Sequence, residues 1–190
     1  MSTTPIEAHF EETHEVRNQV PEFGPCDLWA TDAVLREAVT REGAVAFAAH
    51  LGGYGRLAGD ALYRLSWDAH RDRPRLRTHD RFGKRIDRVE FHPAYHEIMG
   101  AAICGGVAGL SWATQAWQLP EAGAHVARAA LSYLHHQVEP GSSCPLTMTH
   151  AAIPALRRES ALREWADKAV TPHYDPRELP IAEKPGVTLG

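Results

Sequence analysis

The sequence EAGAHVARAALSYLHHQV at residues 121–138 contains the clearest helical pattern of the chain. Its apolar residues recur three and four positions apart, which places them on one stripe of a helix. Glu139-Pro140-Gly141 follows, and this combination ends a helix. This segment therefore predicts a helix at the centre of a helical domain. The predicted inward stripe is Val126, Ala130, Tyr133, Leu134, Gln137 and Val138, with Arg128, Ser132 and His135 off it.

Three further helical runs precede this one. Thr31 is a suitable N-cap for a run that ends at Gly43, and a second run covers 44–51 and stops at Gly52-Gly53. A third covers about 57–69 and ends before Pro74, because proline breaks a helix. Its predicted inward residues are Leu57, Leu62, Leu65 and Trp67.

Residues 75–91 alternate between apolar and polar side chains around a glycine-containing turn at 80–84, which predicts an exposed β-hairpin. Pro93 suits the first position of the next helix. The apolar run at 98–113 is too short to cross a bilayer, so we interpret it as a buried helix. Shorter helices are predicted over 146–157 and 160–169, and prolines prevent helix from 172 onward.

These patterns predict a mainly α fold with one short β-hairpin near 75–91. We expect three regions: an irregular N-terminal arm at 1–30, a helical domain at 31–170, and a Pro-rich linker at 171–190 that leads into a middle β domain absent from this sequence.

The composition limits the function classes. Twenty Lys and Arg against twenty-four Asp and Glu give a formal charge of −4, so the field of the whole chain does not attract polyanions. No basic segment or apolar core typical of a signal peptide opens the chain, and three widely spaced cysteines fit reduced thiols in the cytoplasm. Residues 71–92 hold eight Lys or Arg and four acids, a local net of +4; the interleaved acids favour a solvated hairpin over a phosphate contact.

Three motifs suggest chemistry but lack the required context. Gly53-Tyr54-Gly55-Arg56-Leu57-Ala58 matches a dinucleotide fingerprint, yet a helical run precedes it where a strand is needed, so a glycine-rich helix connector is favoured. His92 and His96 have the spacing of two metal ligands on one helix face, but no third ligand follows, and His92 suits a helix entry. Ser111 lacks the strand and final glycine of a nucleophile elbow. We predict no metal site and no self-contained catalytic site.

Four strings taken together resemble one family. They are THEVRNQ at 13–19, LREAVTREG at 35–43, VEFHPAYH at 89–96 and QVEPGSSCPLTMT at 137–149. In this order they are similar to the N-terminal domain of the AidB-type, adaptive-response branch of acyl-CoA dehydrogenases, and the resemblance extends from about residue 13 to 190.

The resemblance implies a FAD-dependent homotetramer in which this domain is followed by a middle β domain and a C-terminal helical bundle. Such proteins are linked to the DNA-alkylation response, with weak oxidation of acyl-CoA thioesters and with DNA bound through the C-terminal part. The main FAD motif and the catalytic base would lie beyond Gly190, so we expect no catalytic residue here, and neither activity nor bound FAD in this chain alone.

Within this resemblance, Met148 and Thr149 are the candidate residues for the wall of the flavin and acyl pocket, with ordinary core packing as the alternative for Met148. Two functions stay open for the parent protein. In the first, the parent oxidises acyl-CoA, and this domain supplies the pocket wall and the oligomer contacts. In the second, the parent protects DNA, and this domain is a non-catalytic scaffold.

Overall fold

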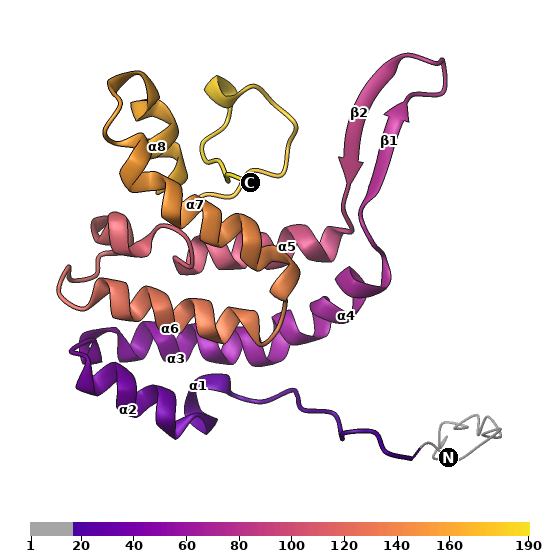
Figure 1. The fold of residues 1–190 in the computed structure, drawn as a ribbon. Helices are drawn as coiled ribbons and strands as arrows, with labels where there is room; N and C mark the ends of the chain where they lie inside the picture. The colour runs from indigo at the N-terminus through magenta and orange to yellow at the C-terminus, as the bar shows by residue number, and fades with distance from the viewer. Residues whose placement is uncertain (1–16) are drawn as a thin grey trace, which may run out of the picture.

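The computed structural model describes residues 17–190 and confirms a mainly α fold with one antiparallel hairpin (Figure 1). The first residues of the predicted arm, and most of the 13–19 string, lie outside the described residues. The α-helices and strands are α1 (Leu28–Thr31), α2 (Ala33–Arg41), α3 (Ala48–Leu57), α4 (Tyr63–Arg71), β1 (Arg75–His79), β2 (Arg85–Glu90), α5 (Pro93–Gly105), α6 (Ala124–His136), α7 (Ser143–Leu156) and α8 (Arg163–Ala169). The short helical turns are η1 (Val45–Phe47), η2 (Ala58–Leu62), η3 (Leu110–Trp112), η4 (Thr114–Trp117), η5 (Pro140–Ser142), η6 (Ser160–Leu162) and η7 (Ile181–Glu183).

The core lies where α3, α5 and α6 pack together, and α6 is the predicted central helix. Its predicted stripe is displaced by about one residue. Ala127 and Leu131 join Leu134 at the centre of the buried face, while Tyr133 is 51% exposed. His135, predicted to lie off the stripe, has no exposed surface at all.

The burial of His135 has a clear cause, because both ring nitrogens have partners inside the protein. The hydroxyl of Tyr54 lies 2.8 Å from Nδ1, and Ser142 Oγ lies 2.7 Å from Nε2. Ser142 Oγ donates to the carbonyl of Glu139 at 3.1 Å, so Nε2–H donates to Ser142 and the Tyr54 hydroxyl donates to Nδ1. Burial lowers the pKa of His135 to about 4, which keeps the imidazole neutral.

Glu139 extends this polar chain to the surface. Its carboxylate accepts the backbone N–H groups of Gly141 and Ser142 and thereby caps η5. His70 Nε2 of α4 lies 3.3 Å from the same carboxylate. Burial opposes ionisation of Glu139, but the hydrogen bonds from Ser142, Gly141 and His70 outweigh it and lower the pKa. This series of hydrogen bonds, which runs from Tyr54 through His135, Ser142 and Glu139 to His70, therefore joins α3, α6, η5 and α4.

The predicted N-cap at Thr31 is wrong. Asp27 caps α1 by accepting from the N–H groups of Trp29 and Ala30, and Asp32 caps α2 by accepting from Leu35. Thr31 is instead the last residue of α1. The two carboxylates are charged acceptors at helix N-termini, which is a favourable position for negative charge.

The predicted break at Gly52-Gly53 is also wrong, because α3, the π-helical turn η2 and α4 form one continuous rod from 48 to 71. Glycine is needed at Gly59, where a Cβ atom would overlap the carbonyl oxygen of Cys26. Leu57 and Trp67 were predicted to point inward but are 40% and 56% exposed. A π turn adds one residue to the helix, so the buried faces of α3 and α4 are out of phase.

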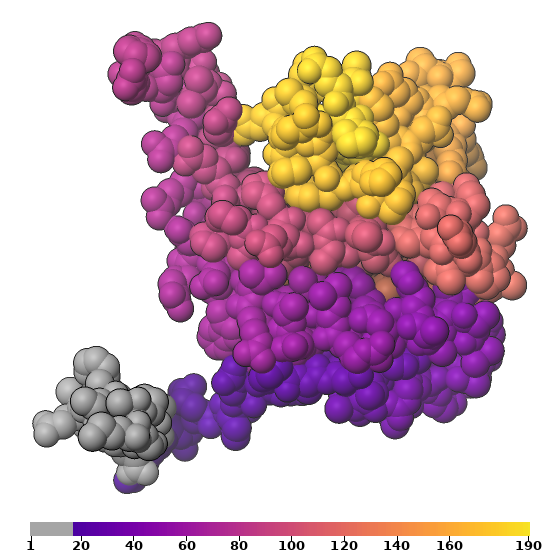
Figure 2. All heavy atoms as spheres, turned by 180° about the vertical axis from the view of Figure 1, so that it is seen from behind, coloured from indigo at the N-terminus to yellow at the C-terminus, as the bar shows by residue number. Residues whose placement is uncertain are grey.

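The predicted hairpin is confirmed. Strands β1 and β2 pair antiparallel with Leu76 opposite Val89, and a bulge interrupts the register between Arg77 and His79. Figure 2 shows the hairpin standing out from the helical body with the C-terminal residues beside it. Nearly every strand residue is exposed, so the hairpin has no core of its own.

The predicted linker residues 171–190 pack back onto the helices. Tyr174 bonds to His96 of α5, Val187 N donates to the carbonyl of Lys168 of α8, and Leu189 N donates to Thr149 Oγ1 of α7. Within 17–190, no helix has both the length and the apolar character that a membrane span requires.

Candidate functional site

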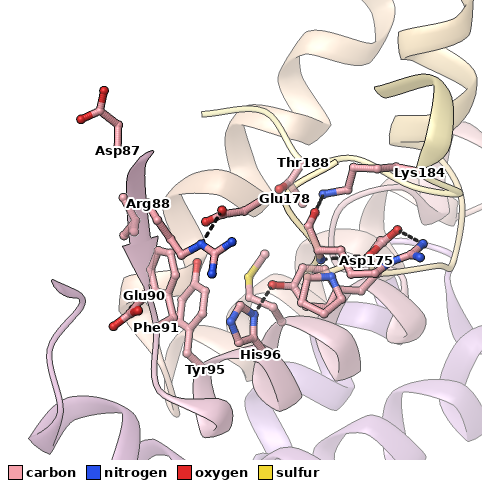
Figure 3. A pocket seen from close by; sticks show the side chains of 15 residues that line it. Asp87, Arg88, Glu90, Phe91, Tyr95, His96, Asp175, Glu178, Lys184 and Thr188 are labelled. Atoms are coloured by element: carbon pink, nitrogen blue, oxygen red, sulfur yellow. Dashed lines mark hydrogen bonds and ion pairs between the residues drawn. The ribbon is translucent and has the colours of Figure 1, made fainter. Parts of the chain in front are cut away.

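A groove of about 990 Å³ opens between β2, the first turns of α5 and the C-terminal segment (Figure 3). It exists because the hairpin rises from the N-terminal end of α5 while residues 174–188 fold back across the same helix. Its lining includes Arg88, Phe91, Tyr95, His96, Tyr174, Asp175, Arg177, Glu178 and Lys184.

The floor of the groove is aromatic. The rings of Phe91 and Tyr95 stack with centroids 4.3 Å apart, and His96 Nδ1 lies 2.8 Å from the hydroxyl of Tyr174. Burial raises the pKa of Tyr174 to about 12 and lowers the pKa of His96. Both groups of this hydrogen bond are therefore neutral near pH 7.

The rim of the groove is charged, and its ions are already paired. Arg88 Nε donates to Glu178 at 2.8 Å and ties the hairpin to the C-terminal segment. Arg177 donates to Asp175 through Nε at 2.8 Å and Nη2 at 2.7 Å, and these bonds lower the pKa of Asp175 to about 2. Lys184 Nζ donates to the carbonyl of Arg177 at 2.8 Å. The groove is therefore a polar recess in which the rim cations Arg88, Arg177 and Lys184 already have partners.

The two histidines with metal-ligand spacing serve other purposes. His92 caps α5 by accepting from the N–H of Ala94 at 3.2 Å, and Pro93 opens the helix as predicted. His96 is bonded to Tyr174. Across the described residues, no three His, Cys, Asp or Glu side chains gather closely enough to hold a metal ion.

The glycines of the dinucleotide-like string lie inside α3, with no strand before them in the described chain. Gly55 is buried against Trp29 of α1. The string is a place of close helix packing instead of a phosphate loop, and the predicted connector role is wrong because the helix continues through it.

The predicted wall residues Met148 and Thr149 lie on α7 and differ from each other. Met148 is 45% exposed, and its Sδ is 3.7 Å from the thiol of Cys144. Thr149 is fully buried; its hydroxyl donates to the carbonyl of Pro145 at 2.7 Å and accepts from Leu189 N at 2.9 Å. The exposed face of α7 carries no charged residue; it consists of Cys144, Thr147, Met148, Ala151, Pro154 and Ala155.

The groove itself was missed by sequence reasoning. Its two defining contacts, His96 with Tyr174 and Arg88 with Glu178, join residues 78 and 90 positions apart. No motif spans such separations. The one available signal was the cluster of Tyr, Asp and Arg between the prolines of the tail.

This arrangement of helices recurs in about a third of each of two solved structures. A Caenorhabditis elegans ACDH-11 structure in complex with C11-CoA superimposes with a TM-score of 0.69 at 20% identity, over 89% of this chain and 30% of that one. The structure of Bd2924 in its apo form gives a TM-score of 0.68 at 21% identity, over 77% of this chain and 30% of that one. A structural similarity at 20–21% sequence identity establishes the fold and not the function.

The chain belongs to the family of adaptive response protein AidB N-terminal domains, which it matches over residues 18–176. It is 39% identical over 182 residues to the putative acyl-CoA dehydrogenase AidB of Escherichia coli, a match that covers 94% of this chain. The chain spans about a third of that relative's length, since the match covers 33% of it.

Proposed function

We propose that this chain is the N-terminal part of a FAD-dependent acyl-CoA dehydrogenase-like protein of the AidB branch, to which it contributes pocket wall and contacts between subunits. Membership of the AidB family and the 39% identity to the E. coli relative support the enzyme class. The fold neighbour that binds C11-CoA supports an acyl-CoA thioester as the substrate class.

The observation that carries this proposal is the uncharged outer face of α7. A 14-residue surface helix normally shows charged side chains to solvent. Here the exposed face carries a thiol, a thioether, a threonine and small apolar side chains. Such a face suits contact with another domain or with an apolar chain.

The roles of the two wall residues follow from their geometry. Met148 projects outward, and its flexible thioether can adapt to an acyl chain or a flavin ring. Thr149 lies behind it and anchors the C-terminal segment through Leu189, so it positions the wall without contacting the ligand.

The described residues fit FAD as a wall and not as its principal holder. The Cys144–Met148 surface is apolar and uncharged, which suits a ring face, but the cations that line the groove, Arg88, Arg177 and Lys184, are occupied by Glu178, Asp175 and a carbonyl. When bound by the other domains, FAD would supply the oxidation of the acyl chain. This chain would orient the acyl group and exclude water.

The experiment uses a protein that spans the length of the relatives, with Met148→Lys compared against Glu37→Gln on α2. A charge at 148 should reduce kcat/KM for acyl-CoA oxidation by about tenfold or more, because the apolar acyl group would meet a desolvated ammonium. The flavin absorbance of Met148→Lys should equal that of the natural protein. Glu37 is exposed and pairs with Arg41, so its variant should keep full activity. Unchanged kcat/KM in Met148→Lys, or absence of flavin in the natural protein, would contradict the proposal.

The scaffold role in a DNA-protective protein is the second candidate, and the hairpin bears on it. Four of its arginines are already paired with acids, namely Arg75, Arg77, Arg85 and Arg88. This pairing disfavours direct phosphate binding by the hairpin, so DNA contact would fall to the C-terminal part. A cytoplasmic location fits the three cysteines, none of which forms a disulfide in the described chain.

A further inference from the structure

The first turn of α6 has no acidic residue and no side-chain cap, and Gly123 is the N-cap. His125 occupies the second helical position instead. The N-terminus of a helix carries about half a positive charge, so anions are favoured there and cations are not. This end of α6 lies on the side of the body away from the hairpin (Figure 1).

Trp112 of η3 packs against two histidines, His125 and His150, beside this end of α6. Its ring centroid is 4.9 Å from His125 and 5.3 Å from His150 of α7, and the two imidazoles are 6.3 Å apart. His150 Nδ1 lies 3.0 Å from the carbonyl of Ala108, and Trp112 Nε1 donates to the carbonyl of His150 at 3.0 Å. Nδ1 of His150 also lies 3.0 Å from Trp112 Nε1, an indole N–H that can only donate, so neighbours on both sides engage Nδ1 and Nε2 is the nitrogen left for another partner.

Arg128 adds a guanidinium one turn further along α6. Its Nε donates to the carbonyl of Val107 at 2.8 Å, but Nη2 is buried and has no hydrogen-bond partner among residues 17–190. Ser111 Oγ of η3 is buried without a partner in the same part of the chain. Because η3 packs directly on α6, both unsatisfied groups belong to one packing region.

The charges in this region are unbalanced. Burial lowers the pKa of Arg128; burial, Arg128 and His125 together lower the pKa of His150. Arg157 approaches from the end of α7 and donates to the carbonyl of Trp112. In the described chain, none of these groups forms an ion pair with Asp or Glu. Glu121, the acid nearest in sequence to His125 and Arg128, accepts at its backbone carbonyl from the N–H of Ala124. Arg128 therefore brings a cation into this region that no carboxylate offsets among residues 17–190.

We propose that Trp112, His125, Arg128 and His150 form a surface site for the phosphate group of a small molecule. A phosphate has enough oxygens to accept from two imidazoles and from the first-turn amides of α6 that follow Ala124, whose own N–H donates to Glu121. The buried guanidinium of Arg128 adds a positive electrostatic potential without contacting the phosphate. The indole of Trp112 packs against both imidazole rings and fixes their positions. Binding would place a negative charge near a guanidinium that has no carboxylate partner in the described chain.

The test is a titration of the protein with inorganic phosphate at pH 6.5 and constant ionic strength, followed through the NMR signals of the imidazole Cε1–H groups. The signals of His125 and His150 should shift along one saturating curve. His136 at the other end of α6 is the internal control and should not shift. Sodium acetate is the comparison anion, and we expect it to bind at least about fivefold more weakly because it has two acceptor oxygens where phosphate has four.

The double variant His125→Gln/His150→Gln should weaken phosphate binding about tenfold or more, because it removes two charge-assisted donors. His136→Gln should leave binding unchanged. The single variant His125→Gln, at an exposed position, serves if the double variant does not fold. Shifts that rise linearly without saturation, equal affinity for acetate, or binding that survives loss of the histidines would each overturn the proposal.

Discussion

The helical body and the β1–β2 hairpin use similar hydrogen-bond distances in opposite surroundings. In the body, Tyr54, His135 and Ser142 bond at 2.7–2.8 Å without contact with water. In the hairpin, Arg77 and Glu90 bond at 2.6 Å with side chains that are 60% and 39% exposed. A buried polar group left without its partner is costly, whereas an exposed ion pair contributes little. The distances alone therefore do not rank these contacts; burial does.

The largest effect should come from the body, at Gly59. Gly59→Ala should lower the free energy of unfolding by about 3 kcal/mol or more, because its Cβ would overlap the carbonyl oxygen of Cys26. Gly53→Ala is the matched control: it lies in the same rod with open space around its Cα, and should stabilise by about 0.5–1 kcal/mol. Chemical denaturation measures both. Equal effects of the two substitutions would show that the rod is not packed as described.

Acid should destabilise the body through His135. The pKa of this imidazole is lowered to about 4 from an ordinary value of 6.5, mainly by burial. Between these values the unfolded chain binds a proton that the folded chain does not, so the free energy of unfolding falls as the pH falls. From pH 7 to pH 5 the loss should be about 2 kcal/mol. Denaturation of His135→Gln across the same range should give a flatter profile; parallel profiles would exclude His135 as the cause.

Removal of one hydroxyl should give a smaller loss. Tyr54→Phe leaves His135 Nδ1 without its donor, and the free energy of unfolding should fall by about 1–2 kcal/mol. Tyr133→Phe, on the exposed side of α6, should change stability by less than about 0.5 kcal/mol. If both substitutions cost the same, burial would not be the deciding factor in this comparison.

The smallest effect should come from the hairpin. Glu90→Gln removes the ion pair with Arg77, and we expect a loss below about 1 kcal/mol because both side chains are hydrated. Thermal unfolding in low salt and in 1 M NaCl provides the control, since salt screens exposed pairs and should erase the difference. If Glu90→Gln lowered the free energy of unfolding as much as Tyr54→Phe does, and independently of salt, burial would not distinguish the contacts of the body from those of the hairpin.

Elements fixed by local chemistry could be predicted from the sequence. The alternation at 75–91 and the turn residues specify the hairpin, and His92-Pro93 specifies the start of α5. The identity of the N-cap was missed, because Asp27, Thr31 and Asp32 are all suitable caps and only the packing of α1 on α3 decides among them.

The burial of His135 could not be predicted, because it depends on a tyrosine 81 positions away that supplies the missing hydrogen bond. Periodicity ranks a histidine as polar and cannot see such a partner. The candidate wall residues show the same limit. The sequence selects Met148 and Thr149 together, but only the fold separates an exposed thioether from a hydroxyl that anchors Leu189.

The π turn η2 sets the direction in which the hairpin leaves the molecule. Each helical residue turns the chain by about 100°, and α4 runs into β1 after only three intervening residues, 72–74. Deletion of one residue within 58–62 would restore regular α-helix and rotate α4, with the hairpin that follows it, by about that angle relative to α3. The hairpin would then swing around the α4 axis and lose the Arg88–Glu178 tether, so the 990 Å³ groove would open. The width of the groove is therefore set by the length of a helix that does not line it.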